Sequence, residues 1–232
     1  MYKYEMHLHT YPVSGCAKVS VKDNIEFYKA LGYDGIFITN HFLDGNLNAE
    51  YRHLPYEEKI KFYFSDYEEG VKLGAEVGLR VFCGLEMSLA GTDFLVYGLD
   101  KQWWLDHPEV MDMKKSVQLP FLMENGAIIF QAHPFREAKY IDHIRLFPCV
   151  DGIEVINAER TDFVNQMAEL YADHYGKLKI AGTDKHGGIM TRRLAGIETK
   201  TPITSVEDFI QKMRNGETSL FLMANPLRPK EE

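Results

Sequence analysis

Cysteine is scarce in this chain of 232 residues, which contains three: Cys16, Cys83 and Cys149. An odd number of distant cysteines, with no C-x-x-C pair among them, argues against both a disulfide framework and a structural zinc knot. We therefore expect reduced thiols.

The sequence also lacks an uncharged apolar run long enough to cross a bilayer. Its first residues, Met1 to Glu5, lack the basic start and apolar run of a secretory signal. No repeat or low-complexity stretch interrupts the chain. These absences predict a cytoplasmic protein with no membrane partner.

Positive charge is not in excess, since the chain has 26 lysines and arginines and 34 aspartates and glutamates, which gives a formal net charge of -8. This balance argues against a broad surface that neutralises the phosphates of a nucleic-acid polymer. A small substrate fits better. The oligomeric state stays open.

Apolar residues are plentiful, at 45% of the chain, and they can build one sizeable core, so a single domain over residues 1–232 is expected. Short apolar runs alternate with amphipathic stretches, which predicts about seven strands joined by crossover helices. The expected strands are Tyr4–His9, Gly35–Thr39, Arg80–Gly84, Phe94–Tyr97, Ala127–Ala132, Gly152–Ile156 and Leu178–Ala181, with a last apolar run at Ser219–Met223. The expected helices are one capped by Ser20 and ending at Gly32, Pro55–Gly78, Asp106–Asn125 (kinked or divided by Pro120), Ala138–Leu146, Thr161–Tyr175 and one starting at Ser205.

Residues of the metal-ligand type stand where these strands end. Alternate residues of a strand face the same side, so His7 and His9 aim two imidazoles at one point while Leu8 packs the other way. The later members of the set are Asn40, His41, Glu86, Asp93, His133, Glu154, Asn157, Asp184 and His186. In an α/β barrel with parallel strands, most of these groups would converge on one rim, where such barrels carry out their chemistry.

The other four histidines do not lie at strand ends, and we interpret them as ordinary surface residues: His53, His107, His143 and His174. Five of the nine histidines therefore cluster in a pattern that, together with Glu86 and Asp184, favours a metal site.

Five of these strand-end segments occur in a fixed order that resembles the PHP (polymerase and histidinol phosphatase) superfamily of metal-dependent phosphoesterases. They are His7-Leu8-His9-Thr10, Thr39-Asn40-His41, Gly84-Leu85-Glu86, His133-Pro134-Phe135-Arg136 and Gly182-Thr183-Asp184-Lys185-His186. The resemblance covers nearly the whole chain and implies a distorted seven-stranded (β/α)7 barrel of the TIM type that holds two or three divalent ions.

The resemblance also implies a set of metal ligands. His7, His9, Glu86 and Asp184 would surround a first ion, and Glu86 would bridge to a second ion. That second ion would also be bound by His133. Asp93 would be a further ligand of the second ion, at a position where relatives often have a histidine. His41 and His186 would hold a third ion together with a loop residue. Imidazole and carboxylate together suit zinc, manganese or iron.

Two positions depart from the family pattern. Asn40 replaces the usual aspartate before His41, although an amide can still orient a ring. Cys16 or Ser14 stands in the loop where relatives often present an aspartate or histidine. Cys16 would either supply a thiolate to the third ion or pack against the barrel.

By the same resemblance, clustered ions would activate a water that attacks a phosphate ester, and Glu86, His186 and Arg136 are the expected catalytic residues. Arg136 is the first candidate for binding the substrate phosphate, and Lys185 and the pair Arg192-Arg193 come next. We expect Glu154 and Asn157 to support ligands rather than to bind metal, and Trp103-Trp104 to serve packing.

Several functions remain open. The first is hydrolysis of a small phosphomonoester, such as histidinol phosphate or a nucleotide. Alternatives are a PHP-type protein-tyrosine phosphatase and a non-catalytic metal-binding regulatory domain. An amidohydrolase-like barrel is disfavoured, because that family places a bridging lysine after its fourth strand, where this chain has none.

Overall fold

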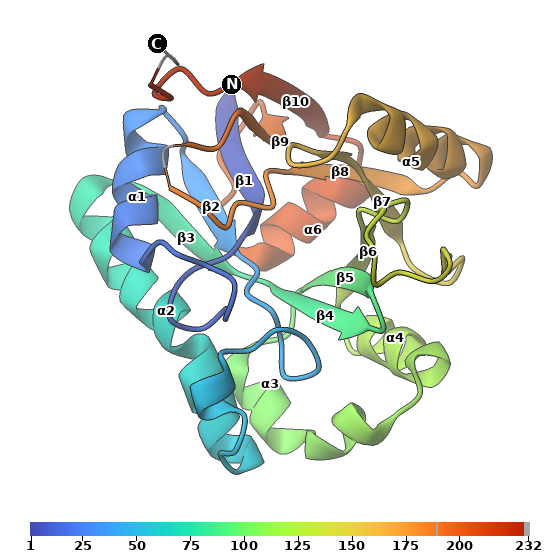
Figure 1. Ribbon diagram of the computed structural model, residues 1–232. Helices are drawn as coiled ribbons and strands as arrows, with labels where there is room; N and C mark the ends of the chain where they lie inside the picture. Colours follow the sequence, from blue (N-terminus) through green and yellow to red (C-terminus); the bar gives the residue numbers. More distant parts are fainter. Residues whose placement is uncertain (189, 230–232) are drawn as a thin grey trace.

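The computed structural model describes residues 1–188 and 190–229, which form a mixed α/β fold (Figure 1). All seven expected strands are present within a few residues of the expected bounds. The strands are β1 (Tyr2–Leu8), β2 (Gly35–Ile38), β3 (Arg80–Cys83), β4 (Leu85–Leu89), β5 (Thr92–Tyr97), β6 (Ile128–Ala132), β7 (Gly152–Asn157), β8 (Leu178–Gly182), β9 (Arg193–Thr199) and β10 (Thr218–Ala224). The helices are α1 (Val21–Ala30), α2 (Tyr56–Val77), α3 (Lys101–Asp106), α4 (Lys115–Glu124), α5 (Asp162–His174) and α6 (Val206–Arg214), with short 3-10 turns at Ala49–Tyr51 and Pro108–Asp112.

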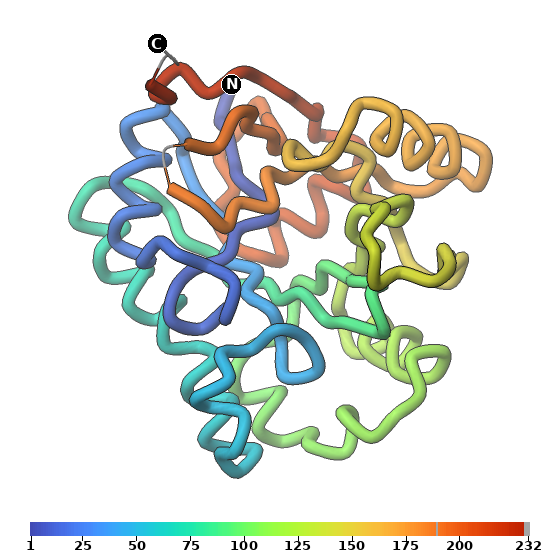
Figure 2. Tube along the Cα trace, in the orientation of Figure 1, coloured from blue at the N-terminus to red at the C-terminus, as the bar shows by residue number. Residues whose placement is uncertain are grey.

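The strands form two five-stranded sheets, in the orders β10-β9-β1-β2-β3 and β4-β5-β6-β7-β8. The sheets meet at the carboxyl end of β1, where Leu8 bridges Lys185 in parallel, and after β2, where His41 bridges Glu86. Figure 2 shows the blue first strand running beside red and orange segments from the other end of the chain, in agreement with the antiparallel pairing of β1 and β9. Residues distant in sequence are thereby brought to one place.

One apolar cluster is shared by both sheets and lies between them. Tyr4 and Phe37 of the first sheet, Tyr97 and Phe130 of the second, and Phe209 of α6 are all buried in it. Outside the first sheet, α1 and α2 lie side by side (Figure 1), while α5 packs on β7 and β8. The ligand-bearing strand ends are thus held on a rigid scaffold. None of the helices in the described ranges is both long enough and apolar enough to span a membrane.

Helix boundaries follow the expected capping chemistry. The Ser20 and Ser205 side chains accept hydrogen bonds from the backbone of the first turns of α1 and α6. α2 ends at Gly78, whose φ of 68° is the left-handed conformation that glycine adopts readily.

The prediction that all strands run in parallel is wrong for the hairpin β4–β5, in which Glu86 pairs with Leu95 in antiparallel register. Ala90 and Gly91 connect the two strands with φ values of 45° and 87°, a tight turn that leaves no room for a crossover helix. Glu86 therefore follows β3, as expected, but lies inside a further strand that was not expected. Strand β9, also antiparallel to its neighbours, was not expected.

Two helix predictions are also wrong. Residues 138–146 form no helix, because the Gln131 side chain binds the backbone of Arg145 and Phe147 and holds this segment as a loop. The stretch expected at 106–125 is divided before α4, at the turn Pro108–Asp112, while Pro120 is accommodated inside α4.

Candidate metal centre

The first strand delivers two imidazoles to one point, as its alternation predicts. His7 and His9 are almost fully buried, and their Nε2 atoms lie 3.2 Å apart. Leu8 between them is buried in a hydrophobic cluster against α1.

A single carboxylate, that of Glu86 in β4, lies among four imidazoles. Its Oε1 is 3.2 Å from Nε2 of His7 and 3.2 Å from Nε2 of His133. Its Oε2 is 3.4 Å from Nε2 of His9 and 2.7 Å from Nδ1 of His41. Each oxygen therefore faces a different pair of rings.

Asp184 closes the cluster from the end of β8. Its Oδ1 lies 3.5 Å from Nε2 of both His7 and His9, and 3.4 Å from Nδ1 of His186. A side chain on Gly182 would collide with His7, so this glycine allows β8 to approach β1 closely.

Backbone strain accompanies the cluster. In the described ranges the non-glycine residues with positive φ are Ala90, His133 at 28° and Asp184 at 56°, and two of the three are predicted ligands. Such conformations are unfavourable for residues with a Cβ and concentrate at functional sites.

All eight predicted metal ligands meet in this cluster. Their donor atoms fall into sets within 4.8 Å: His7, His9 and Asp184; Glu86, Asp93 and His133; and His9, His41 and His186, with a further set of His7, His133 and Glu154. The second of these sets has the residues expected for the second ion. The first set lacks Glu86 of the expected four, and the third contains His9 where a loop residue was expected. His53, His107, His143 and His174 belong to none of the sets, and they are exposed or half-buried.

The donor set fits divalent ions. Nδ1 of His41 and Oε2 of Glu86 are buried and lie close to each other, but not in hydrogen-bond geometry, so each lacks a hydrogen-bond partner among the described residues. Buried polar atoms are rarely left unpaired without a functional reason. Imidazole nitrogens and carboxylate oxygens converging in this way suit zinc, manganese or iron.

Charges within the cluster are strongly coupled. Burial alone would raise the pKa of Glu86, but the His41 and His7 imidazoles hold that pKa well below its usual range. Burial would lower the pKa of His41, but the Glu86 carboxylate raises it to about 10. The pKa of His9 is well below normal because of burial and because His186 and His41 lie near it. Without metal, protons on some rings therefore balance the carboxylates.

Groups behind the ligands orient them. Nδ1 of His7 lies 2.8 Å from Oε1 of Glu154, whose other oxygen accepts from the His133 backbone and from the Asn157 amide. Nδ1 of His186 donates to the Asp184 carbonyl at 2.9 Å. Glu154 and Asn157 thus lie where the sequence analysis expected supporting residues, behind the ligands.

The cationic side chains at the rim differ in part from the expectation. Arg136 lies against the cluster, with Nη2 2.8 Å from Oδ2 of Asp93. Arg160, which sequence analysis missed, approaches from the loop after β7, with Nη2 2.9 Å from Oδ2 of Asp184. The one sequence feature that could have identified Arg160 is its position just after the end of a predicted strand. Each arginine also has a buried Nε without a hydrogen-bond partner among the described residues.

Two other candidate cations do not face the cluster. Lys185 is 1% exposed and points under α1, where its Nζ donates to Asn24 and lies 4.5 Å from the ring centroid of Phe27. The prediction of Lys185 as a rim cation is therefore wrong. Arg193 binds Asp162 and the backbone carbonyls of Ala158 and Arg160, so it holds the loop that carries Arg160.

Cys16 adjoins the third donor set. Burial alone would raise the pKa of its thiol, but hydrogen bonds with His186 and His41 lower it to about 6. Cys16, His41 and His186 line the same cavity, so the thiol lies beside two predicted ligands of the third ion.

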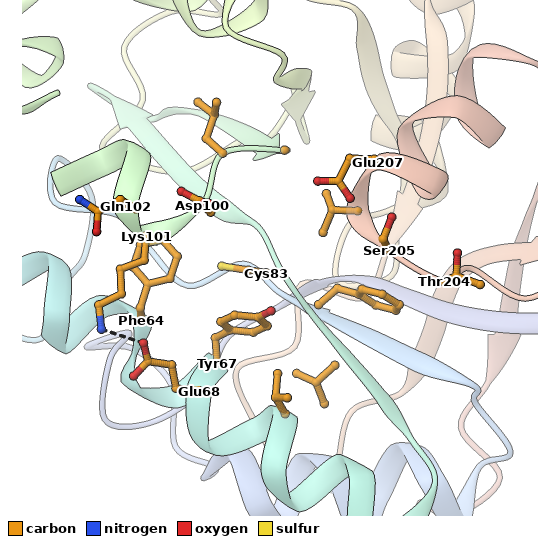
Figure 3. Close-up of a pocket in the computed structure, with 16 residues that line it drawn as sticks. Phe64, Tyr67, Glu68, Cys83, Asp100, Lys101, Gln102, Thr204, Ser205 and Glu207 are labelled. Atoms are coloured by element: carbon orange, nitrogen blue, oxygen red, sulfur yellow. Dashed lines mark hydrogen bonds and ion pairs between the residues drawn. The ribbon is translucent and has the colours of Figure 1, made fainter. Parts of the chain in front are cut away.

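Three cavities bear on where a ligand could bind. One of about 840 Å³ opens beside Asp184 and His186 and is lined by Arg160, Thr191 and Arg192. Another of about 480 Å³ is lined by Cys16, His41, Arg136 and Arg160. A third, of about 500 Å³, lies between α2, β3 and the start of α6 around Cys83 (Figure 3), and none of the predicted ligands lines it. The first two therefore lead to the metal centre.

Comparisons with known proteins show a shared fold. No protein-family model matches the chain, and no curated protein matches it significantly. Solved structures do match. A two-domain protein from Bacteroides vulgatus containing a predicted PHP-like metal-dependent phosphoesterase has a TM-score of 0.72 at 17% identity, covering 95% of this chain and 64% of that one. This chain thus spans less than two thirds of that protein.

Two further structures match over nearly their full lengths. A proposed metal-dependent phosphoesterase from Bifidobacterium adolescentis has a TM-score of 0.57 at 12% identity, covering 90% of this chain and 94% of that one. An amidohydrolase from Chromobacterium violaceum, solved with sulfate and no metal, has a TM-score of 0.55 at 12% identity, covering 93% of this chain and 97% of that one. At such identities these likenesses establish the fold alone.

Proposed function

We propose that this chain is a PHP-type metal-dependent phosphoesterase that hydrolyses a small phosphomonoester. The observation that carries the proposal is the position of Glu86, whose two oxygens each face two imidazoles. A carboxylate placed in this way is suited to bridge metal ions. The PHP-like phosphoesterases among the structural neighbours support the same reaction class.

We assign residues to ions from the three donor sets. His7, His9 and Asp184 would hold the first ion, together with Glu86, whose oxygens lie 3.2 Å from His7 and 3.4 Å from His9. Glu86, Asp93 and His133 would hold the second ion, and His9, His41 and His186 the third. Zinc, manganese or iron bound there would lower the pKa of a water and neutralise the oxygens of the phosphate ester. We also propose that the two sheets form the wall of one distorted (β/α)7 barrel in a single domain.

The side chains at the mouth would bind substrate. Arg136 and Arg160 each present a guanidinium to a cluster carboxylate, and a planar guanidinium is well suited to phosphate oxygens. His186 has the most exposed ring of the ligand set, at 31%. Its Nδ1 donates to a carbonyl, and the residue lines both cavities beside the cluster. Its Nε2 would hold the third ion or protonate the leaving group.

An amidohydrolase reaction is a second candidate, because one structural neighbour is an amidohydrolase. The bridging position here is taken by a glutamate, however, and Lys185 is turned away under α1. These residues favour the phosphoesterase.

The test is a hydrolysis screen of manganese- or zinc-loaded protein against histidinol phosphate, nucleotide monophosphates, phosphotyrosine and an N-acyl amino acid, with phosphate or amine release measured. Phosphate release that is lost in Glu86→Gln supports the proposal. Amide cleavage without phosphate release would replace it with the amidohydrolase. If the loaded protein turned over no substrate, the non-catalytic regulatory function would take its place.

A further inference from the structure

A buried polar network lies behind His9, on the side of the ring away from the metal centre. It consists of Thr10, Ser14, Asn40 and Asp66, each at most 2% exposed. Asp66 comes from the middle of α2, far from the other three in sequence. Such networks stabilise a fold only when every member finds a partner.

The orientation of the Asn40 amide follows from its neighbours. The backbone N–H of Thr10, which can only donate, lies 2.7 Å from Oδ1 of Asn40. On the other side, the Thr10 hydroxyl donates to Oδ2 of Asp66 at 2.6 Å and accepts from Nδ2 of Asn40 at 2.7 Å. The carboxylate of Asp66 therefore determines that position 40 presents an N–H to Thr10 and an oxygen to Ser14.

This orientation fixes the proton on Ser14 and, through it, the proton on His9. The Ser14 hydroxyl donates its only hydrogen to Oδ1 of Asn40 at 2.8 Å. It already accepts from the His41 backbone N–H at 2.9 Å. At its 3.0 Å contact with Nδ1 of His9, Ser14 can therefore only accept, so His9 carries its proton on Nδ1.

The consequence lies at the other ring nitrogen. With Nδ1 protonated in the neutral ring, Nε2 of His9 keeps its lone pair, and this atom faces His7, Glu86 and Asp184 at 3.2 to 3.5 Å. We propose that Asp66, Asn40 and Ser14 are positioning residues that lock His9 in the tautomer able to bind a metal ion, and that position 40 is an amide because position 66 is a carboxylate. The inference rests on the metal centre proposed above but not on the substrate.

The pairing explains why an aspartate at position 40 would not suit this chain. Nδ2 of Asn40 lies 3.4 Å from Oδ2 of Asp66, so a carboxylate at position 40 would set two buried negative charges against each other. One of them would have to take up a proton. Exchanging the two residues, Asn40→Asp with Asp66→Asn, keeps one amide and one carboxylate in contact with Thr10.

The first measurement reads the tautomer directly, in metal-free protein. The 15N chemical shifts of the histidine ring nitrogens distinguish a protonated from an unprotonated nitrogen. We expect His9 of the wild type to be protonated at Nδ1 alone, and Ser14→Ala to yield a mixture of both forms. A wild-type His9 protonated at Nε2, or no change in Ser14→Ala, would overturn the proposal.

The second measurement is zinc affinity by competition with a chelator. We expect Asn40→Asp to weaken zinc binding about 10–100-fold, the usual effect of losing a group that orients a ligand. The exchanged double variant should bind zinc about tenfold or more tightly than Asn40→Asp does. Gln118→Glu is the matched control, because Gln118 is a buried amide that bonds Val110 and Lys115 in and beside α4. It should lower the unfolding temperature without weakening zinc binding.

The outcomes separate this inference from the proposed function. If the double variant bound zinc no better than Asn40→Asp, the coupling between positions 40 and 66 would be wrong. If wild-type protein bound no zinc at all, the metal centre would fail, although the tautomer of His9 would still be measurable.

Discussion

The carboxylate of Glu154 lies 2.8 Å from Nδ1 of His7, while Nε2 on the opposite side of the same ring faces Glu86 at 3.2 Å. The other Glu154 oxygen accepts from the backbone N–H of His133 at 2.9 Å. One buried carboxylate thus orients two side chains that are predicted to bind different ions. Carboxylates that bind the outer nitrogen of a ligand histidine fix its tautomer and make the ring a stronger ligand.

Replacing Glu154 by glutamine should therefore weaken metal binding while preserving the shape of the site. We expect about a 10–100-fold loss of zinc or manganese affinity, measured by chelator competition. Glu169→Gln, on the exposed side of α5, is the control and should leave affinity unchanged. Equal affinities for Glu154→Gln and wild type would show that Glu154 does not act through His7.

The stability of the metal-free protein should fall as pH rises above neutrality. The Glu86 carboxylate raises the pKa of His41 to about 10 against the effect of burial, whereas histidine in an unfolded chain has a pKa of about 6.5. The stabilisation from protonated His41 is complete below about pH 6.5 and is lost as pH rises toward 10. The carboxylates have depressed pKa values, so their contribution is lost only in acid. The Cys16 thiol, with a pKa lowered to about 6, gains stability with rising pH, but the pKa values of His7 and His186 are raised together with that of His41, so the net stability still falls.

Thermal unfolding in the presence of EDTA from pH 6 to 10 measures this trend, and His41→Gln should flatten it. Zinc-loaded protein should behave differently. Metal displaces the ring protons, so its affinity rises with pH and compensates for the lost stabilisation. A wild-type unfolding temperature that stayed constant across this range without metal would contradict the expected charge on His41.

Cys16 should react faster than an ordinary thiol, because its hydrogen bonds with His186 and His41 lower its pKa to about 6 despite burial. The thiolate is the reactive form. At pH 7, iodoacetamide should modify Cys16 well before Cys83, whose pKa is raised by burial. Using a Cys149→Ser background removes the exposed thiol, and peptide mass mapping identifies the modified residue.

Zinc should protect Cys16 if the third donor set binds an ion beside it. In the same experiment, a saturating zinc concentration should slow modification at Cys16 more than tenfold while leaving the slow reaction of Cys83 unchanged. Unaltered labelling in zinc-saturated protein would indicate that no ion binds next to this cysteine.

The convergence of the expected ligands on one place could be predicted from the sequence because part of it depends on local rules. Alternation along β1 gives His7 and His9 a common direction, and parallel strands bring their carboxyl ends to one edge. Lys185 lies beyond the end of β8, where strand alternation no longer applies. It bridges Leu8 and points, like Leu8, away from the predicted ligands, so its expected role at the rim was wrong.

What could not be predicted depends on contacts between distant segments. The hairpin β4–β5 is formed by a tight turn at Ala90 and Gly91. Only Gly84 separates β3 from β4, so the sequence does not show where one strand ends and the next begins. The contact of Asp66 with Asn40 has no local signal, since a polar residue in the middle of a helix is normally solvent-exposed. Arg160 lies on a loop whose position is determined by Arg193.

Arg160 should contribute to substrate binding, because its guanidinium reaches the cluster and also lines both cavities that lead to it. A hydrogen bond between a charged donor and phosphate contributes about 1.5–3 kcal/mol, and each 1.4 kcal/mol is about a factor of ten. We therefore expect Arg160→Ala to lower kcat/KM for a phosphomonoester about 10–100-fold, with inorganic phosphate becoming a correspondingly weaker inhibitor. Arg192→Ala is the control and should have a smaller effect, because Arg192 is an exposed arginine that lines the same larger cavity.

Arg160 also contacts Asp184, so metal content must be measured in each variant. Arg160→Lys keeps the charge but not the planar guanidinium, and it should recover only part of the loss. Unchanged phosphate inhibition together with a lower metal content would assign Arg160 to holding Asp184 rather than to binding substrate.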